Sequence, residues 1–110
     1  MYIHIKNQKI VASVSTTSVL YIEKDGRKLR VVTENREFSY YEKMNNVEPL
    51  LDNTFFLCRK GCYINLSKIA LMENQCITFI NGEKYWLGRD NFNRTKKQFI
   101  NFLNNCKTIR

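Results

Sequence analysis

The chain has few of the residues that interrupt regular structure, with four glycines and one proline among 110 residues. Disordered and low-complexity chains are usually rich in these residues, so the composition favours a folded globular protein. No run approaches the roughly 18 to 20 apolar residues that a membrane-spanning helix requires, and the N-terminus lacks the apolar core of a signal peptide. We therefore expect one domain over residues 1–110, cytoplasmic and without membrane insertion.

The residues that carry most enzyme chemistry are scarce or poorly placed. The only histidine is His4, in an N-terminal segment with strand character. There is no recognisable serine or cysteine nucleophile motif, no glycine-rich phosphate loop and no paired-carboxylate signature. We predict that the protein is not an enzyme, has no catalytic residue and uses no cofactor.

The four cysteines do not have the spacing of a metal site. A structural zinc site usually needs two close pairs of Cys or His ligands, whereas Cys58 and Cys62 form one pair, and Cys76 and Cys106 are isolated. In an extended segment the Cα atoms of Cys58 and Cys62 would be about 13 Å apart, beyond the ~4.4 to 6.8 Å of a disulfide. Only a tight turn at Gly61 could join them. We expect no metal and interpret the cysteines as reduced packing residues, with a disulfide or thiol switch as the less favoured alternative.

A strong positive charge is what the chain does have. The net charge is +8 and the pI is about 9.5, which favours polyanionic partners. Residues 1–54 hold eight Lys or Arg and seven Asp or Glu, whereas residues 55–110 hold ten and three. We therefore expect a contact surface built mainly from the second half.

Most of the sequence alternates between apolar and polar residues as β-strands do. The expected strands are residues 2–10, 19–23, 29–33, 37–41, 55–59, 63–72, 76–80 and 84–87. The pair Asn81-Gly82 between the last two predicts a hairpin with a type I′ turn, in which both central residues have positive φ.

Helical spacing occurs in two segments. Residues 42–51 form a short candidate whose last turn is disturbed by Pro49. A second helix is expected from Asp90, with Asp90 or Asn91 as the N-cap and Phe92, Phe99 and Leu103 in one apolar stripe.

Basic residues recur beside glycines at three turns. These are Arg27 and Lys28 after Gly26, Arg59 and Lys60 before Gly61, and Arg89 after Gly88. One such turn is more often a solvated surface turn. Three of them in a chain of this charge favour nucleic-acid contacts, because arginine can bind guanine through two hydrogen bonds and lysine attracts phosphate.

Three segments occur in an order and spacing typical of one family: SVLYIEKDGRKLRVVT, FFLCRKGCYINLSKIALME and ITFINGEKYWLGRDNFNRTKKQF. Over essentially its whole length the chain resembles the LytTR-type DNA-binding domain of the LytR/AlgR class of bacterial transcription regulators. The resemblance implies a mostly β, elongated fold of small antiparallel sheets, with one short helix between strands and a C-terminal helix. It also implies DNA binding through loops that enter successive major grooves.

The resemblance assigns roles to individual residues. The implied base contacts are Arg27, Lys28, Lys60 and Arg89. The implied backbone contacts are Arg59, Gly61, Gly88 and, on the C-terminal helix, Arg94, Lys96 and Lys97. Gly61 and Gly88 stand where the family usually has serine, so a hydroxyl is lost while a backbone N–H remains. Asn65 and Leu66 match a pair for which we expect a structural role at the end of a strand.

The leading hypothesis is a sequence-specific regulator of double-stranded DNA that binds as a homodimer or tandem pair on repeated half-sites. Expected partners are an upstream receiver domain, if the chain is a fragment, or a regulatory antagonist protein. One alternative is a module for single-stranded nucleic acid or RNA that stacks bases on Tyr40, Tyr41, Tyr63 and Trp86. Another is a protein-interaction module without DNA affinity.

Overall fold

The computed structural model describes residues 1–106. Its strands are β1 (Tyr2–Lys6), β2 (Val11–Ser15), β3 (Val19–Asp25), β4 (Lys28–Thr33), β5 (Glu37–Tyr41), β6 (Phe55–Arg59), β7 (Cys62–Asn65), β8 (Ile69–Glu73), β9 (Cys76–Phe79) and β10 (Lys84–Trp86). Its helices are α1 (Met44–Val47) and α2 (Arg89–Asn105), with 3-10 turns η1 (Thr16–Ser18), η2 (Glu48–Leu50) and η3 (Leu66–Lys68). The fold is mostly β, with one short helix and a C-terminal helix, as predicted.

A five-stranded antiparallel sheet forms the middle of the molecule, in the order β5-β4-β3-β7-β6. Its central strand, β3, begins with the apolar run from Val19 to Ile22, all of which is buried. Such a run is typical of a strand that is covered on both faces. A bulge follows Val19. Val19 and Ile22 face one side of the sheet, and Leu20 and Tyr21 face the other.

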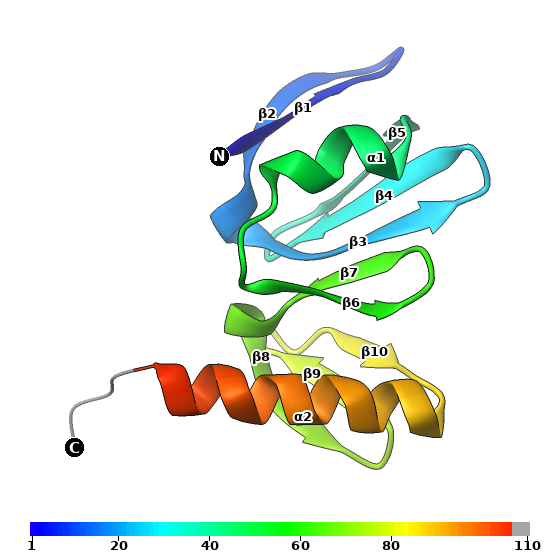
Figure 1. Cartoon of the computed structure of the whole chain (residues 1–110). Coiled ribbons are helices and arrows are strands. Elements are labelled where there is room, and N and C mark those ends of the chain that lie inside the picture. The colour runs from blue at the N-terminus through cyan, green and yellow to red at the C-terminus, as the bar shows by residue number, and fades with distance from the viewer. Residues whose placement is uncertain (107–110) are drawn as a thin grey trace.

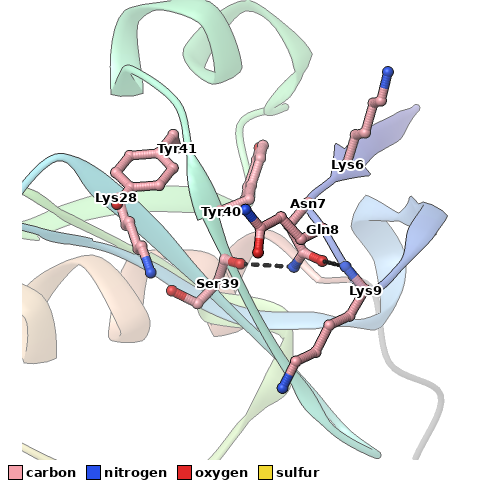
Figure 2. Close-up of a pocket in the computed structure, with 8 residues that line it drawn as sticks. All are labelled: Lys6, Asn7, Gln8, Lys9, Lys28, Ser39, Tyr40 and Tyr41. Atoms are coloured by element: carbon pink, nitrogen blue, oxygen red, sulfur yellow. Dashed lines mark hydrogen bonds between the residues drawn. The ribbon is translucent and has the colours of Figure 1, made fainter.

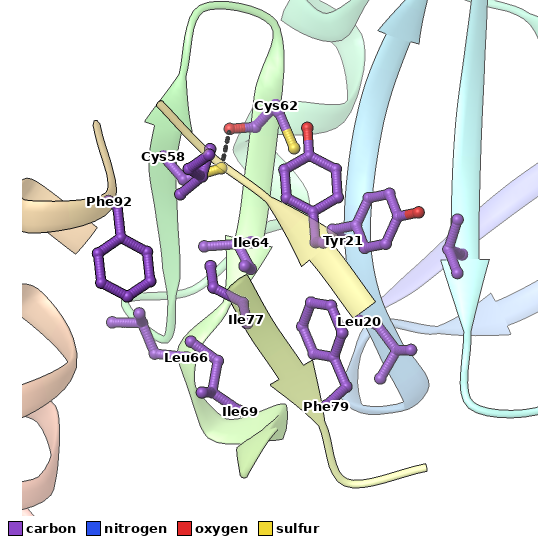
Figure 3. Close-up of a cluster of buried hydrophobic side chains, with 13 residues drawn as sticks. Leu20, Tyr21, Cys58, Cys62, Ile64, Leu66, Ile69, Ile77, Phe79 and Phe92 are labelled. Carbon is purple, nitrogen blue, oxygen red and sulfur yellow. Dashed lines mark hydrogen bonds between the residues drawn. The ribbon is translucent and has the colours of Figure 1, made fainter. Parts of the chain in front are cut away.

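Two smaller sheets cover the central one (Figure 1). On one side the β1-β2 hairpin and α1 enclose a core that includes Ile3, Ile5, Val19, Ile22 and Val47. On the other side the β10-β9-β8 sheet and α2 enclose a second core, drawn in Figure 3, that includes Leu20, Tyr21, Ile64, Ile77 and Phe92. The molecule extends 45 × 31 × 25 Å. Within the described part of the chain no helix is long and apolar enough to cross a membrane.

The segment 63–72, which we expected to be one strand, is two strands in different sheets. The chain leaves the central sheet at Asn65, turns through η3, and enters the C-terminal sheet as β8. The Asn65 side chain makes this break. Its NH2 group donates to the Val19 carbonyl (2.9 Å), and its Oδ1 accepts from the Ser67 N–H (3.1 Å). The expected structural role of Asn65 is confirmed, but the single strand was wrong.

The first predicted strand also breaks. Residues 7–10 form a turn, closed by a hydrogen bond from the Asn7 N–H to the Ile10 carbonyl (3.0 Å), and β2 follows it. This turn contains no glycine or proline, so the sequence only weakly predicts a turn at this place. The helical segment around Pro49 is likewise divided into α1 and η2, with Pro49 in the first turn of η2, where a missing N–H costs little.

Two hairpin turns differ from expectation. At Asn81-Gly82 the hairpin is present, but only Gly82 has positive φ (91°), so the turn is not type I′. The Gly82 N–H bonds to the Phe79 carbonyl, which makes a longer loop. Positive φ at both central residues occurs instead at Asn74 (53°) and Gln75 (62°), between β8 and β9.

Helix α2 begins one residue earlier than predicted, and Phe92 and Phe99 of the predicted stripe pack against the core. Its N-cap is Gly88, which has no side chain to cap the helix, and Asp90 lies in the first turn. Phe92 and Thr95 are buried, whereas Leu103 is 51% exposed. The inward stripe continues through Phe102 rather than Leu103.

Candidate nucleic-acid interface

The three basic turns lie along one side of the molecule. In Figure 1 the β3-β4 turn, the β6-β7 turn and the connection from β10 to α2 are all at the right. We call the turns at Gly26–Arg27, Lys60–Gly61 and Gly88–Arg89 the loop edge. The four-residue β9-β10 loop lies at the other end, since the Asn81 side chain donates to the Glu34 carbonyl (2.9 Å) in the β4-β5 turn.

Hydrogen bonds join the neighbouring parts of the loop edge. The Lys24 N–H donates to the Gly61 carbonyl (2.7 Å), which links the first two turns. Near the third, the Leu87 N–H donates to the Gln75 carbonyl (3.0 Å), and the Gln75 side chain returns a bond to the Leu87 carbonyl (3.2 Å). The first two turns are therefore linked directly, and the chain just before the third is fixed to the β8-β9 turn.

Three of the four predicted base-contacting residues are free at the surface. Arg27, Lys60 and Arg89 are exposed, and within residues 1–106 none of them is in an ion pair. Lys28 is half-buried, with its Nζ 5.0 Å from the centre of the Tyr41 ring. The face of an aromatic ring attracts a cation, so Tyr41 restrains the Lys28 ammonium group while that group keeps its positive charge.

Arg59 differs, because its side chain is engaged within the protein. Its guanidinium donates through Nε to the Tyr85 hydroxyl (2.7 Å) and through Nη2 to the Glu23 carboxylate. A third bond reaches the Lys60 carbonyl (3.3 Å). Arg59 thus fixes the start of the β6-β7 turn against β3 and β10.

Glu23 is the centre of this network, and the sequence analysis did not identify it. Its carboxylate also accepts from Arg30 Nη1 (3.1 Å) and from the Tyr85 hydroxyl (2.8 Å). Burial, the Cys62 thiol and the hydrogen bond to Glu23 together raise the pKa of Tyr85, so its phenol remains a donor at neutral pH. The available sequence signal was an acidic residue at the end of the apolar run VLYI, at a position that pairs with Arg30.

Arg94 is also engaged, at the contact between α2 and β6. Its two Nη groups donate to the carbonyls of Leu57 (3.1 Å) and Cys58 (3.4 Å). The guanidinium lies 5.1 Å from the centre of the Phe56 ring. Lys96 and Lys97, by contrast, are exposed on α2.

The two glycines of the loop edge have different backbone requirements. Gly61 has a φ of +79°, and a Cβ there would lie 3.4 Å from the Lys24 Cβ. Gly88 has a φ of −63° and nothing within 4 Å of an added Cβ. A side chain is therefore strained at position 61 but accommodated at position 88.

The cysteines flanking Arg59 and Lys60 are buried at the base of the turn (Figure 3). Both are free thiols, and Cys58 Sγ donates to the Cys62 carbonyl at 3.5 Å. The hydrogen bond with Cys62 and burial raise the pKa of Cys58. The burial of Cys58, Cys62 and Cys76 agrees with the interpretation as packing residues, whereas Cys106 is exposed. Among the residues that the structure describes, no group of three His, Cys, Asp or Glu side chains is arranged to hold a metal ion.

The four aromatic residues proposed for base stacking do not form one surface. Tyr40 is buried, and the Tyr63 hydroxyl donates to Glu48 (2.6 Å). Tyr41 and Trp86 are exposed, but they belong to different sheets, on β5 and β10. The arrangement gives no continuous stacking platform for a single strand.

Comparison with known proteins identifies the family. Residues 8–100 match the sequence model of the LytTr DNA-binding domain. Among solved structures, the chain is similar to a LytTr DNA-binding domain from Bacillus cereus, part of a protein described as a methyl-accepting/DNA response regulator. That likeness has 17% sequence identity and a TM-score of 0.71, and it covers 90% of this chain and 95% of the other. No curated protein sequence gives a significant match.

The chain belongs to the LytTR family of DNA-binding domains. The resemblance found in the sequence is thereby confirmed, and the solved structure confirms the fold. Membership implies DNA binding in transcription regulation, and it confirms that the protein is not an enzyme, since the family is non-catalytic.

Proposed function

We propose that the protein is a sequence-specific regulator that inserts the basic turns of the loop edge into successive major grooves of double-stranded DNA. The observation that carries the proposal is that the three turns of the loop edge lie on one side of the molecule (Figure 1) and contain Arg27, Lys60 and Arg89. These three residues are exposed and are in no ion pair within residues 1–106. The long dimension of the molecule is 45 Å, and one turn of B-DNA is about 34 to 36 Å. One protein molecule is therefore long enough to follow the duplex from one groove toward the next.

The proposal gives base contacts to Arg27, Lys28, Lys60 and Arg89. Arginine can read guanine O6 and N7 through two hydrogen bonds, and an unpaired arginine keeps all its donors for this purpose. Lys28 is next to Arg27 and has its ammonium group restrained above Tyr41. Its reach into the groove is shorter than that of Arg27, so we expect it to contribute less to base selection.

Phosphate contacts are proposed for the backbone N–H groups at Gly61 and Gly88 and for Lys96 and Lys97. Gly88 is the N-cap of the 17-residue helix α2, and helix N-termini favour anions because their first N–H groups lack partners. Lysine at exposed helical positions supplies charge without a fixed geometry.

Arg59 and Arg94 are proposed phosphate contacts of a more limited kind. A guanidinium has five N–H donors, and each of these two residues directs three bonds into the protein. The remaining donors can reach a phosphate while the others hold β6 in place. We therefore propose that Arg59 and Arg94 both hold β6 in position and bind phosphate.

The wider assembly forms part of the proposal. We propose that the protein acts in the cytoplasm as a homodimer or tandem pair on repeated half-sites. It is controlled either by a receiver domain in the same polypeptide or by an antagonist protein. One domain covers about one turn of duplex. A second copy bound beside it raises the overall affinity and extends the DNA sequence that is recognised.

The test begins with selection of bound duplexes from a random pool, which gives the site and the spacing of its repeats. Arg89→Ala should then cost about 1 to 3 kcal/mol on that site and relax specificity at one base pair. Lys96→Ala should weaken binding to all duplexes about equally. Equal losses on selected and random duplex for Arg89→Ala would contradict base reading.

Two further measurements separate the alternatives. Affinity for duplex should fall steeply between about 50 and 200 mM salt, since phosphate contacts release counterions. Salt-independent binding to another macromolecule would instead favour a protein-interaction module. Preference for single strands in a competition assay would favour base stacking over groove reading.

A further inference from the structure

The β1-β2 turn forms one wall of an open hollow beside the β3-β4 hairpin. The hollow has a volume of about 720 Å³. Its lining is shown in Figure 2: Lys6, Asn7, Gln8, Lys9, Lys28, Ser39, Tyr40 and Tyr41. In Figure 1 the tip of the β1-β2 hairpin lies at the same side of the molecule as the loop edge. The hollow therefore continues the loop edge beyond Arg27, toward the N-terminal hairpin.

Asn7 fixes the turn that contains Lys9 and directly follows Lys6. The Asn7 side-chain oxygen accepts from the N–H groups of Lys9 (2.8 Å) and Ile10 (3.0 Å). The side-chain amide donates to the Ser39 carbonyl on β5 (3.0 Å), which anchors the hairpin tip to the central sheet. Little backbone order has to be gained when a ligand binds here, so the entropic cost of binding is small.

The charge around the hollow is unbalanced. Three lysines line it, and no aspartate or glutamate does. The ion pairs among residues 1–106 use Arg30, Arg59 and Lys68, so Lys6, Lys9 and Lys28 are without carboxylate partners there. Lysines grouped in this way favour an anion with several charged oxygens along its length, rather than one compact group.

We propose that the β1-β2 hairpin is an additional DNA contact, in which Lys6 and Lys9 bind backbone phosphates flanking the base pairs read by the β3-β4 turn. This inference rests on the proposed function, because its occupant is the same duplex. It adds to the LytTR interface at a place that the family match only reaches at its edge, since Lys6 precedes the matched residues 8–100. The contact surface then includes part of the less basic first half of the chain.

The experiment compares two double variants with equal loss of charge. Lys6→Gln/Lys9→Gln removes the two lysines of the hairpin, which are exposed and form no ion pair among the described residues. The control is Lys68→Gln/Lys84→Gln. Lys68 pairs with Glu34 (2.8 Å) in the β4-β5 turn, away from the loop edge, and the Lys84 ammonium donates to Thr78 (3.3 Å). Circular dichroism verifies that all three proteins are folded at the temperature of the binding assay.

Affinity for the selected duplex is measured as a function of salt. The hairpin variant should show a log–log salt dependence shallower by about 1.8, because each phosphate contact contributes about 0.9 to the slope. At 0.1 M salt this corresponds to a loss of up to roughly 60-fold, alike on selected and random duplexes. Hydroxyl-radical footprinting should show that the hairpin variant loses protection of the deoxyribose backbone at one end of the site.

Two results would overturn the proposal, and they differ in meaning. If both double variants have the same slope and footprint, the hairpin makes no contact, while DNA binding by the wild type leaves the proposed function standing. If the wild type itself binds no duplex with salt-dependent affinity, the proposed function fails and the hairpin contact falls with it.

Discussion

Replacing Glu23 with glutamine tests whether one carboxylate holds the loop edge together. Glu23 accepts hydrogen bonds from Arg30, Arg59 and Tyr85, which belong to β4, β6 and β10. Glutamine keeps the shape and one acceptor oxygen but removes the negative charge between two guanidinium groups. Arg30 retains Glu37 as a partner, whereas Arg59 has no second carboxylate within residues 1–106. The β6-β7 turn should therefore lose more order than the β4-β5 strand pair.

The expected magnitude follows from how far these charges are removed from water. Exposed ion pairs contribute about 0 to 1 kcal/mol, whereas removing one partner of a buried pair costs about 3 to 5 kcal/mol. The side chains of Glu23, Arg30 and Arg59 are 17%, 29% and 40% exposed, so the network lies between the two cases. We expect Glu23→Gln to lower the free energy of unfolding by about 2 kcal/mol. For a domain of this size that lowers the midpoint of thermal unfolding by roughly 8 °C.

The matched control is Glu37→Gln, because Glu37 also pairs with Arg30 but its side chain is 54% exposed. We expect this variant to lose less than about 1 kcal/mol. Thermal and urea unfolding followed by circular dichroism would measure both. Equal losses in the two variants, or a loss below about 0.5 kcal/mol for Glu23→Gln, would refute the argument from burial. In DNA binding, only Glu23→Gln should relax specificity at the base pair read by Lys60.

Three further predictions concern stability. Asn65→Ala should cost about 2 to 3 kcal/mol in urea unfolding, because it removes the η3 cap and a buried hydrogen bond; a loss near zero would deny Asn65 its structural role. Gly61→Ala should cost about 1 to 2 kcal/mol because of its positive φ, whereas Gly88→Ala should be within about 0.5 kcal/mol of the wild type; the reverse order would contradict the backbone geometry. Burial raises the pKa of Tyr40 from 10.0 to about 12, so the wild type should keep its stability below pH 10 and lose it progressively from pH 10 to about 12. Tyr40→Phe should flatten that pH dependence, and the exposed Tyr41→Phe is its control.

The sequence predicts single elements best where one strand stays within one sheet. Residues 37–41 and 55–59 were expected as strands, and β5 and β6 have the same bounds. Alternation of apolar and polar residues indicates the strand at 37–41, because one periodic pattern corresponds to one pair of faces, whereas 55–59 is an apolar run. The family resemblance implied small antiparallel sheets but not the order of their strands, which comes from the structure. Local periodicity contains no information about which strands pair.

The breaks were missed for a different reason. Residues 63–72 keep their apolar character while the chain passes from one sheet to another, so the pattern does not change where the partners do. The type I′ turn was expected at Asn81-Gly82, where the local signal is strong. The structure places two consecutive positive φ values at Asn74 and Gln75, where the pairing of β8 with β9 leaves only two residues for the turn.

The predicted site consisted of DNA contacts and did not include the contacts that its residues make within the protein. The position of Arg59 beside a turn is visible in the sequence, but its partners Glu23 and Tyr85 are 36 and 26 residues away along the chain. The sequence analysis therefore gave Lys60 a base contact and Arg59 a phosphate contact, without indicating that Arg59 is bonded within the protein. In the folded protein one is bonded to three groups and the other is exposed and unpaired among the described residues.

The cations near the loop edge thus form two groups that should respond differently to salt. Those behind the edge, such as Arg30 and Arg59, are partly buried and paired, and buried pairs are screened weakly. Those at the tips, such as Arg27, Lys60 and Arg89, are exposed, so their attraction for phosphate is strongly screened and opposed by counterions. Rising salt should release DNA well before it loosens the turns. In the proposed DNA complex, the arrangement of the turns is therefore stabilised separately from the charges that attract DNA, so affinity should vary with ionic strength while the turns keep their positions.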